Sequence, residues 1–190
     1  LYPIRNVETI PAQYMNKLND SLYVFDLGRN IAGVTKLKIK GKAGAMVRLI
    51  HAERLSPNGR VDLGRISNFH RPTDEEDLFQ TDTYVLSGKG EDVFMPKFNY
   101  KGFRYVEVSC SEPMELKKEC LTGYFMHNDV PEVGNVATSD PIINKIWKAT
   151  NVSYLSNLFG YPTDCPQREK NGWTGDGHLG IEAGLYNYDA

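Results

Sequence analysis

Apolar and polar residues alternate in short runs between Ser21 and Met126. Leu37 and Ile39, for example, alternate with Lys36, Lys38 and Lys40. A period of two residues indicates strands with one buried and one solvated face. Further strands are predicted at residues 46–53, 84–86, 93–95 and 103–110, with turns at 41–44, 87–90 and 101–102. Because no helical period intervenes, the pattern predicts a mainly β fold, an antiparallel β-sandwich.

The period changes to that of a helix near residue 140. Asp140 followed by Pro141 is a helix-start signal, because aspartate caps free backbone N–H groups and proline suits the first helical position. Apolar residues then recur at every third or fourth position, which predicts an amphipathic helix of about five turns. The positions of this stripe are Ile143, Trp147, Thr150, Tyr154 and Leu158, with Ile146 beside them.

A second helix is predicted to begin at Thr174 or Asp176 and to run to the end of the chain. Gly177, Gly180 and Gly184 share one of its faces. Each glycine disfavours a helix by roughly 1 kcal/mol relative to alanine. We therefore expect that this face packs very closely against the first helix.

The changes in pattern predict four regions. They are a leading segment at 1–20, a β-sandwich domain at 21–127, a linker at 128–139 and the N-terminal part of an α-helical domain at 140–190. Two helices with apolar stripes cannot enclose a core by themselves. We therefore expect that the helical domain is truncated and that its remainder packs against them. The first residue, Leu1, is not methionine, which favours a piece of a longer protein or a processed product.

The composition excludes few classes of partner. The chain has 190 residues, 41% of them hydrophobic and 24% charged, which are ordinary globular values. A net charge of −2 gives no electrostatic reason to expect nucleic acid or an anionic membrane as a partner, and no apolar run is long enough for a membrane span. Three cysteines without CxxC spacing argue against a disulfide framework and a zinc site. We expect no metal and no cofactor; the compartment stays open.

One long connection, from Glu53 to Thr81, interrupts the predicted strands. A loop of this length in a compact domain is usually functional or mobile. His51 and Glu53 would lie on one strand face, where a metal pair is one interpretation. A single histidine on a strand is far more often structural, and the same holds for His70 and His127.

Residues 164–176 gather the side chains with the most chemistry. This stretch reads DCPQREKNGWTGD and holds two aspartates, a glutamate, an arginine and a tryptophan. Pro166 restricts its backbone, and Gly172 and Gly175 allow tight turns beside Trp173. Carboxylates can act as acids, bases and hydroxyl acceptors, while an indole packs on the apolar face of a sugar ring. The motif favours a sugar-cleaving site; a solvated loop with incidental charges is the alternative.

This motif closely resembles the signature of bacterial α-L-rhamnosidases, glycoside hydrolase family seventy-eight. Residues 25–33 (FDLGRNIAG) and 98–108 (FNYKGFRYVEV) resemble two hallmarks of the β-sandwich domain of that family. Residues 139–147 (SDPIINKIW) resemble the first helix of its catalytic domain. The resemblance runs from about Ser21 to the end of the chain. The commonest family form of the 164–176 motif is one residue longer.

The resemblance implies β-sandwich domains and an (α/α)6 barrel that together remove terminal α-L-rhamnose from glycosides or polysaccharides by inverting hydrolysis. It assigns Glu169 as the general acid. It assigns the binding of rhamnose to Asp164, Arg168, Trp173 and Asp176. The general base of the family is a glutamate much further along the barrel. We therefore expect these residues to carry the acid half of the mechanism and to be inactive alone. Members occur inside bacterial cells and exported from them.

Other interpretations remain at this stage. The β-sandwich alone would be a carbohydrate-binding module if aromatic residues form an exposed face, the candidates being Tyr84, Tyr100, Phe103 and Tyr105. It would be an accessory module if it only packs beside a catalytic barrel. Asp164 or Asp176 would instead be structural if either caps a helix, and Cys165 is expected to be a small buried filler. A different hydrolase on a similar barrel is the competing enzyme class.

Overall fold

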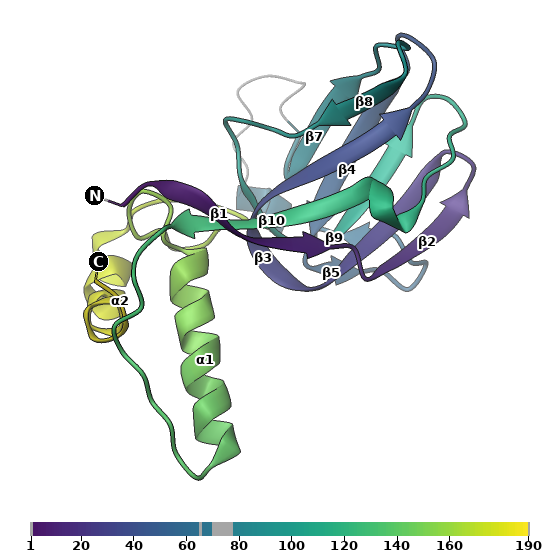
Figure 1. The fold of residues 1–190 in the computed structure, drawn as a ribbon. Coiled ribbons are helices and arrows are strands. Elements are labelled where there is room, and N and C mark those ends of the chain that lie inside the picture. The colour runs from purple at the N-terminus through teal and green to yellow at the C-terminus, as the bar shows by residue number, and fades with distance from the viewer. Residues whose placement is uncertain (1, 65, 70–77, 190) are drawn as a thin grey trace.

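The computed structural model describes residues 2–64, 66–69 and 78–189. It contains a mainly β part and, at one end of it, two helices (Figure 1). The prediction of a mainly β, antiparallel fold is confirmed, since every strand pair in the large sheet is antiparallel. The long connection that follows Glu53 contains β5 (Arg54–Leu55), β6 (Val61–Asp62) and the 3-10 helix η1 (Ile66–Phe69). His70 and the rest of 70–77 lie outside the described residues.

Hydrogen bonds join eight strands into one curled sheet, with the path β1-β10-β3-β9-β4-β7 and with β2 and β8 also paired to β3. Residues 4–19, at the predicted leading segment, thus contribute two strands to the sheet. A short 3-10 helix, η2 (Lys118–Cys120), precedes the last strand. The eight strands are β1 (Ile4–Pro11), β2 (Tyr14–Asn19), β3 (Leu22–Lys40), β4 (Met46–Ala52), β7 (Thr81–Val85), β8 (Glu91–Phe94), β9 (Lys101–Cys110) and β10 (Leu121–Asn128).

The 19-residue strand β3 causes the sheet to curl. It pairs with β2 at its start and with β9 as far as Gly33, and then with β10 and β8 in its last part. The change of partners follows a register shift between Asp26 and Ile31, where Gly28 has a φ of +82°. At Gly33, where β9 and β10 both pair with β3, a Cβ atom would collide with the carbonyl oxygen of Tyr124. Both positions require glycine, which explains both glycines of the 25–33 motif.

The core lies inside the curl. Its largest members are fully buried, and the hydroxyl of one of them, Tyr23, donates a hydrogen bond to the carbonyl oxygen of Met114 at 2.9 Å. Burial of these apolar side chains is the main favourable term in folding of this part. They are Tyr23, Phe25, Leu27, Leu37, Leu49, Phe103, Val106 and Leu121.

Lys101 and Gly102 do not form the turn that the sequence predicts. They begin β9, and the Lys101 side chain is only 2% exposed. Its ammonium contacts the Asp82 carboxylate at 2.6 Å, which offsets the cost of burying a charge. The lysine–glycine pair is typical of a turn, but a buried acidic partner allows it inside a strand.

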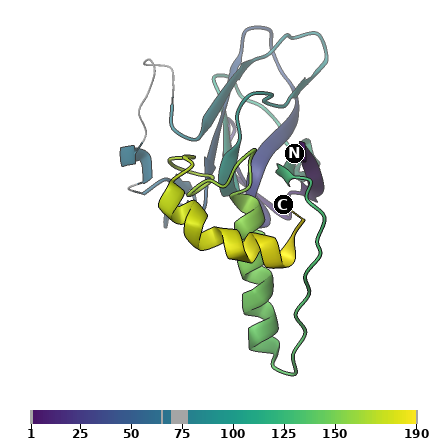
Figure 2. The same cartoon turned by 90° about the vertical axis from the view of Figure 1, so that its left-hand side faces the viewer.

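The first helix, α1 (Pro141–Ser156), begins as predicted. The side chain of Asp140 accepts a hydrogen bond from the backbone N–H of Ile142 at 2.8 Å. The second helix, α2 (Thr174–Asn187), crosses α1, and the crossing lies near the C-terminal end of α2 (Figure 2). Trp147 Nε1 donates to Asn187 Oδ1 at 2.9 Å, which ties the two helices together.

The expected close approach of the glycine face of α2 is confirmed at one position. A Cβ at Gly184 would collide with the ring and hydroxyl of Tyr154 on α1. The prediction is wrong for Gly177 and Gly180, where a Cβ would meet no atom within 4 Å. The helices cross at an angle, as Figure 2 shows, so only one end of this face reaches α1.

Large apolar side chains remain exposed on both helices. They are Ile142, Ile143 and Ile146 on α1, and Leu179, Ile181, Leu185 and Tyr186 on α2, between 48% and 83% exposed. Among the described residues, neither helix has the length and hydrophobicity that crossing a bilayer requires.

Candidate functional site

The 164–176 motif forms the loop between α1 and α2 and the first residues of α2. Asp164 closes this loop, because its Oδ1 accepts from the backbone N–H of Asn171 at 2.9 Å and its own N–H donates to the Asn171 carbonyl, also at 2.9 Å. Oδ2 of Asp164 accepts from the Cys165 thiol at 2.7 Å. Asp164 therefore fixes the shape of the loop and does not cap a helix. Cys165 is buried, as expected of a filler.

Glu169 and Trp173 form the most direct contact among the predicted site residues. The indole Nε1 of Trp173 donates to Glu169 Oε2 at 3.0 Å. Arg168 Nε lies 3.8 Å from the other carboxylate oxygen, Oε1. The side chain of Glu169 is 25% exposed and Trp173 is 53% exposed, so the pair is open to a ligand. These three predicted residues come together.

Asp176 lies on the first turn of α2 and is exposed. No side-chain hydrogen bond caps this helix, so the alternative of a structural cap does not apply to Asp176. Together with Asp164 it lines a cavity of about 590 Å³ between the helices, to which Tyr154 of α1 also contributes. Arg168, Glu169 and Trp173 lie outside this lining. The five predicted residues thus fall into two neighbouring sets that share one loop.

Glu53 is a further candidate residue, which the sequence suggested only as one half of a metal pair with His51. It lines a second cavity, of about 640 Å³, with Asp164 and with Lys148 of α1. Glu53 Oε1 accepts from Asn30 Nδ2 at 3.0 Å. Burial raises the pKa of this carboxyl, while the charges of Arg54 and Arg168 oppose the rise.

The partner proposed for Glu53 in a metal pair, His51, lies in the interior of the β part. Its ring is fully buried, its Nε2 is 3.0 Å from Thr35 Oγ1, and its Nδ1 is 3.1 Å from the carbonyl oxygen of Gln80. These contacts give His51 a structural role. Within the described ranges, His, Cys, Asp and Glu side chains do not gather in threes as a metal site would require.

The four aromatic residues considered for a carbohydrate-binding face do not form one. Phe103 is fully buried, and Tyr84 packs on Phe94 with a centroid distance of 5.0 Å. Tyr100 stacks on Phe159 with a centroid distance of 3.8 Å and an angle of 7° between the rings. Tyr105 lies under the guanidinium of Arg104 at 4.9 Å. Each ring therefore already has a packing partner within the chain.

The contact between the site loop and the β part is the feature that sequence reasoning missed. Lys170 Nζ donates to the carbonyl oxygen of Tyr100 at 2.7 Å. A Cβ at Gly102 would lie 2.9 Å from side-chain atoms of Pro166 and Gln167. The only signal in the sequence was the proximity of Lys101 and Gly102 to aromatic residues in the 98–108 motif, which gave no indication of the loop as a partner.

Two family models match the chain. Residues 16–127 match the bacterial alpha-L-rhamnosidase concanavalin-like domain. Residues 131–190 match the bacterial alpha-L-rhamnosidase 6 hairpin glycosidase domain.

Curated proteins and solved structures that are similar to this chain are also alpha-L-rhamnosidases. An alpha-L-rhamnosidase of Streptomyces avermitilis is 33% identical over 99% of the chain, and one of Formosa agariphila is 34% identical over 98%. The chain spans 17% and 19% of the lengths of these relatives. The structure of alpha-L-rhamnosidase from Dictyoglumus thermophilum has a TM-score of 0.85 at 35% identity, covering 100% of this chain and 21% of that one. That of the Streptomyces avermitilis enzyme complexed with L-rhamnose has a TM-score of 0.84 at 33% identity, covering 99% of this chain and 17% of that one.

Proposed function

Because this chain belongs to the bacterial α-L-rhamnosidase family, we propose that it is the part of a glycoside hydrolase that supplies the general acid for removing terminal α-L-rhamnose. The observation that carries the proposal is the hydrogen-bonded pair of Glu169 and Trp173, with Arg168 beside it. The solved relative with L-rhamnose bound supports the choice of sugar.

Glu169 is proposed to protonate the leaving oxygen in an inverting hydrolysis. An inverting enzyme needs one protonated carboxyl at the glycosidic oxygen and one carboxylate that activates water on the opposite face of the ring. The Trp173 N–H occupies Oε2 of Glu169, which leaves Oε1 to carry the proton.

Asp164, Arg168, Trp173 and Asp176 are proposed to bind the rhamnose. Carboxylates of Asp164 and Asp176 face one cavity and would accept hydrogen bonds from ring hydroxyls. The exposed indole of Trp173 would cover the apolar edge and the methyl group of a deoxy sugar. Arg168 offers donors that fit hydroxyl oxygens.

The two helices are proposed to be the first part of an (α/α)6 barrel, following a β-sandwich domain at 21–127 and a linker at 128–139. The apolar side chains that remain exposed on α1 and α2 support this assignment, because a barrel would cover them. The general base is expected on a later helix, so residues 1–190 alone should not turn over substrate. A terminal rhamnoside of a glycan or smaller glycoside is the proposed substrate class.

The decisive experiment measures hydrolysis of p-nitrophenyl and alkyl α-L-rhamnosides by the full-length enzyme. Glu169→Gln removes the acid, so we expect a loss of at least about 100-fold on the alkyl glycoside, whose leaving group needs a proton. The matched control is Glu119→Gln, at an exposed position in η2. Full activity of Glu169→Gln on the alkyl glycoside would refute the proposed role, and turnover by residues 1–190 alone would refute the missing base.

A further inference from the structure

The backbone takes an unusual conformation directly after Glu169. Lys170 has a φ of +55°, in the left-handed region that residues other than glycine seldom adopt. Such a conformation persists only where surrounding contacts hold it, and it occurs most often at functional sites. The contacts of Lys170 therefore bear on how Glu169 is presented.

One residue of the β part, Tyr100, makes two contacts with the Lys170 ammonium. Nζ donates to the carbonyl oxygen of Tyr100 at 2.7 Å and lies 5.0 Å from the centroid of the Tyr100 ring. A charged donor on a carbonyl and a cation on an aromatic face are each favourable, and together they fix the whole side chain. In the loop itself, the Tyr161 hydroxyl donates to the Lys170 carbonyl at 3.4 Å.

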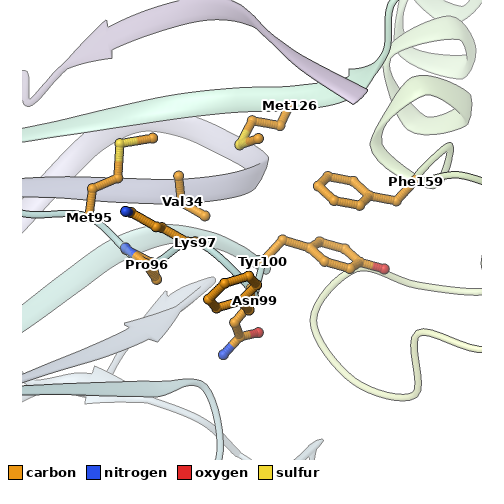
Figure 3. A pocket seen from close by; sticks show the side chains of 9 residues that line it. Val34, Met95, Pro96, Lys97, Asn99, Tyr100, Met126 and Phe159 are labelled. Carbon is orange, nitrogen blue, oxygen red and sulfur yellow. The ribbon is translucent and has the colours of Figure 1, made fainter. Parts of the chain in front are cut away.

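Tyr100 is itself held firmly. Its ring stacks on Phe159, and Figure 3 shows the two rings facing each other beside a hollow of about 580 Å³. Burial is the main reason that the pKa of its hydroxyl is raised to about 12. The ring that receives Lys170 is thus half-buried and packed.

Lys101 and Gly102, the two residues after Tyr100, anchor Tyr100 to the interior of the β part. The side chain of Lys101 reaches Asp82 at 2.6 Å, and the carbonyl oxygen of Gly102 accepts from Gln80 Nε2 at 2.7 Å. Gly102 also lies directly under Pro166, with no room for a side chain. The start of β9 is therefore a fixed platform, and the site loop rests on it.

We propose that Lys170 is a positioning residue for Glu169. Resting on the proposed function, the inference adds that the β part takes part in acid catalysis through this lysine. Its ammonium, held by Tyr100, keeps residue 170 left-handed. This conformation sets the direction of the peptide that follows Glu169 and so keeps the carboxyl on the indole of Trp173. In this role Lys170 acts on the reaction only through the placement of Glu169.

The test compares leaving groups in the full-length enzyme, because a misplaced acid harms only substrates that need its proton. For Lys170→Met we expect kcat on an alkyl α-L-rhamnoside to fall by at least about tenfold, with a fall of less than about threefold on p-nitrophenyl α-L-rhamnoside. KM should change by less than about twofold, since ground-state binding is not affected. Lys170→Arg, which keeps a cationic donor, should restore most of the activity on the alkyl glycoside. Lys89→Met, at an exposed turn, should leave both activities unchanged.

Equal losses on both substrates, or no loss on either, would overturn the inference, as would a Lys170→Arg enzyme as impaired as Lys170→Met. If Lys170→Met does not fold, Gly102→Ala carries the test from the β side, because the atoms nearest to its Cβ belong to Pro166 and Gln167 of the site loop. It should show the same dependence on leaving group, and a parallel loss on both substrates contradicts the proposal. A wild-type enzyme that cleaves neither rhamnoside would refute the proposed function itself.

Discussion

The β part and the helical part of this chain treat apolar side chains in opposite ways. In the β part, Phe25, Leu49 and Phe103 are 0% exposed. In the helical part, Ile142 on α1 is 65% exposed and Leu179 on α2 is 83% exposed. Stability of the β part can therefore come from its own core, whereas the apolar faces of the helices gain little from the described residues.

Charged groups follow the same division. Lys101 and Asp82 pair in the interior of the β part at 8% exposure or less, which only a closed structure can sustain. The pair of Arg168 and Glu169 is only partly buried, at 33% and 25% exposure. The candidate site thus lies where the closed β part meets two helices whose apolar side chains are exposed. Substitutions in residues 1–190 test whether the β part and the helical part differ in this way.

The largest effect is expected at the buried pair. Asp82→Ala leaves the ammonium of Lys101 buried without its partner, so we expect the free energy of unfolding to fall by about 3–5 kcal/mol. The control is Glu112→Ala, which removes the partner of Lys42 in an exposed pair at 3.1 Å and should cost less than about 1 kcal/mol. Urea unfolding followed by circular dichroism measures both. Equal costs would show that the interior of the β part is open to water.

A matched pair of leucines tests the contrast in packing. Leu49→Ala should lower the free energy of unfolding by about 2–5 kcal/mol, because it leaves a cavity in a closed core. Leu179→Ala, the same change at an exposed position, should stay within about 0.5 kcal/mol. The same unfolding measurement applies. A large cost at Leu179 would mean that α2 is already packed in solution.

Two glycines on α2 test how far the helices contact one another. Gly184→Ala places a methyl group against Tyr154 and should lower the melting temperature, with a cost of about 1–3 kcal/mol. Gly180→Ala enters open space and should favour the helix by up to about 1 kcal/mol. Both tryptophans, Trp147 and Trp173, lie in this half of the chain, so their fluorescence reports on it. Opposite shifts of the melting temperature support the observed crossing, and shifts of the same sign contradict it.

The smallest expected effect is a pH dependence of the free energy of unfolding, which arises from buried histidines of the β part. Burial, with the charge of Lys101, holds the pKa of His51 well below its usual value. The unfolded chain then binds more protons below a pH of about 6.5, so stability is present above that pH and is lost as the pH falls, by at most about 1.4 kcal/mol per unit. Burial also lowers the pKa of His127, so His51→Gln should reduce the slope without abolishing it. An unchanged slope in unfolding at pH 5.5 and 7.5 contradicts this account.

The pattern of apolar and polar residues predicted strands and helices well where each side chain faces either the core or solvent. The alternation around Leu37 and the cap at Asp140 both predict what the structure contains. The pattern did not predict that β3 pairs with four other strands of the eight-stranded sheet, because its bend depends on a close approach to β10 at Gly33. Such contacts between distant residues leave no periodic signal.

For the site, the motif identified which residues meet but not what holds them. The pairing of Glu169 with Trp173 follows from their spacing of four along a tight loop. The contact of Lys170 with Tyr100 joins residues 70 apart, and each residue alone has an ordinary alternative reading. Only the folded arrangement makes Lys101 a strand residue and Tyr100 a support for the loop.

The start of β9 also limits how relatives of this chain can change in length. Tyr100, Lys101 and Gly102 turn alternately to the site loop, the interior and the loop again. A residue inserted between Gly102 and Phe103 would reverse every side chain before it, sending a lysine toward the loop and an aromatic ring into the interior. Insertions at the fully exposed Phe98 escape this reversal. We therefore expect relatives of this chain to keep the number of residues at this strand start and to vary in length before it.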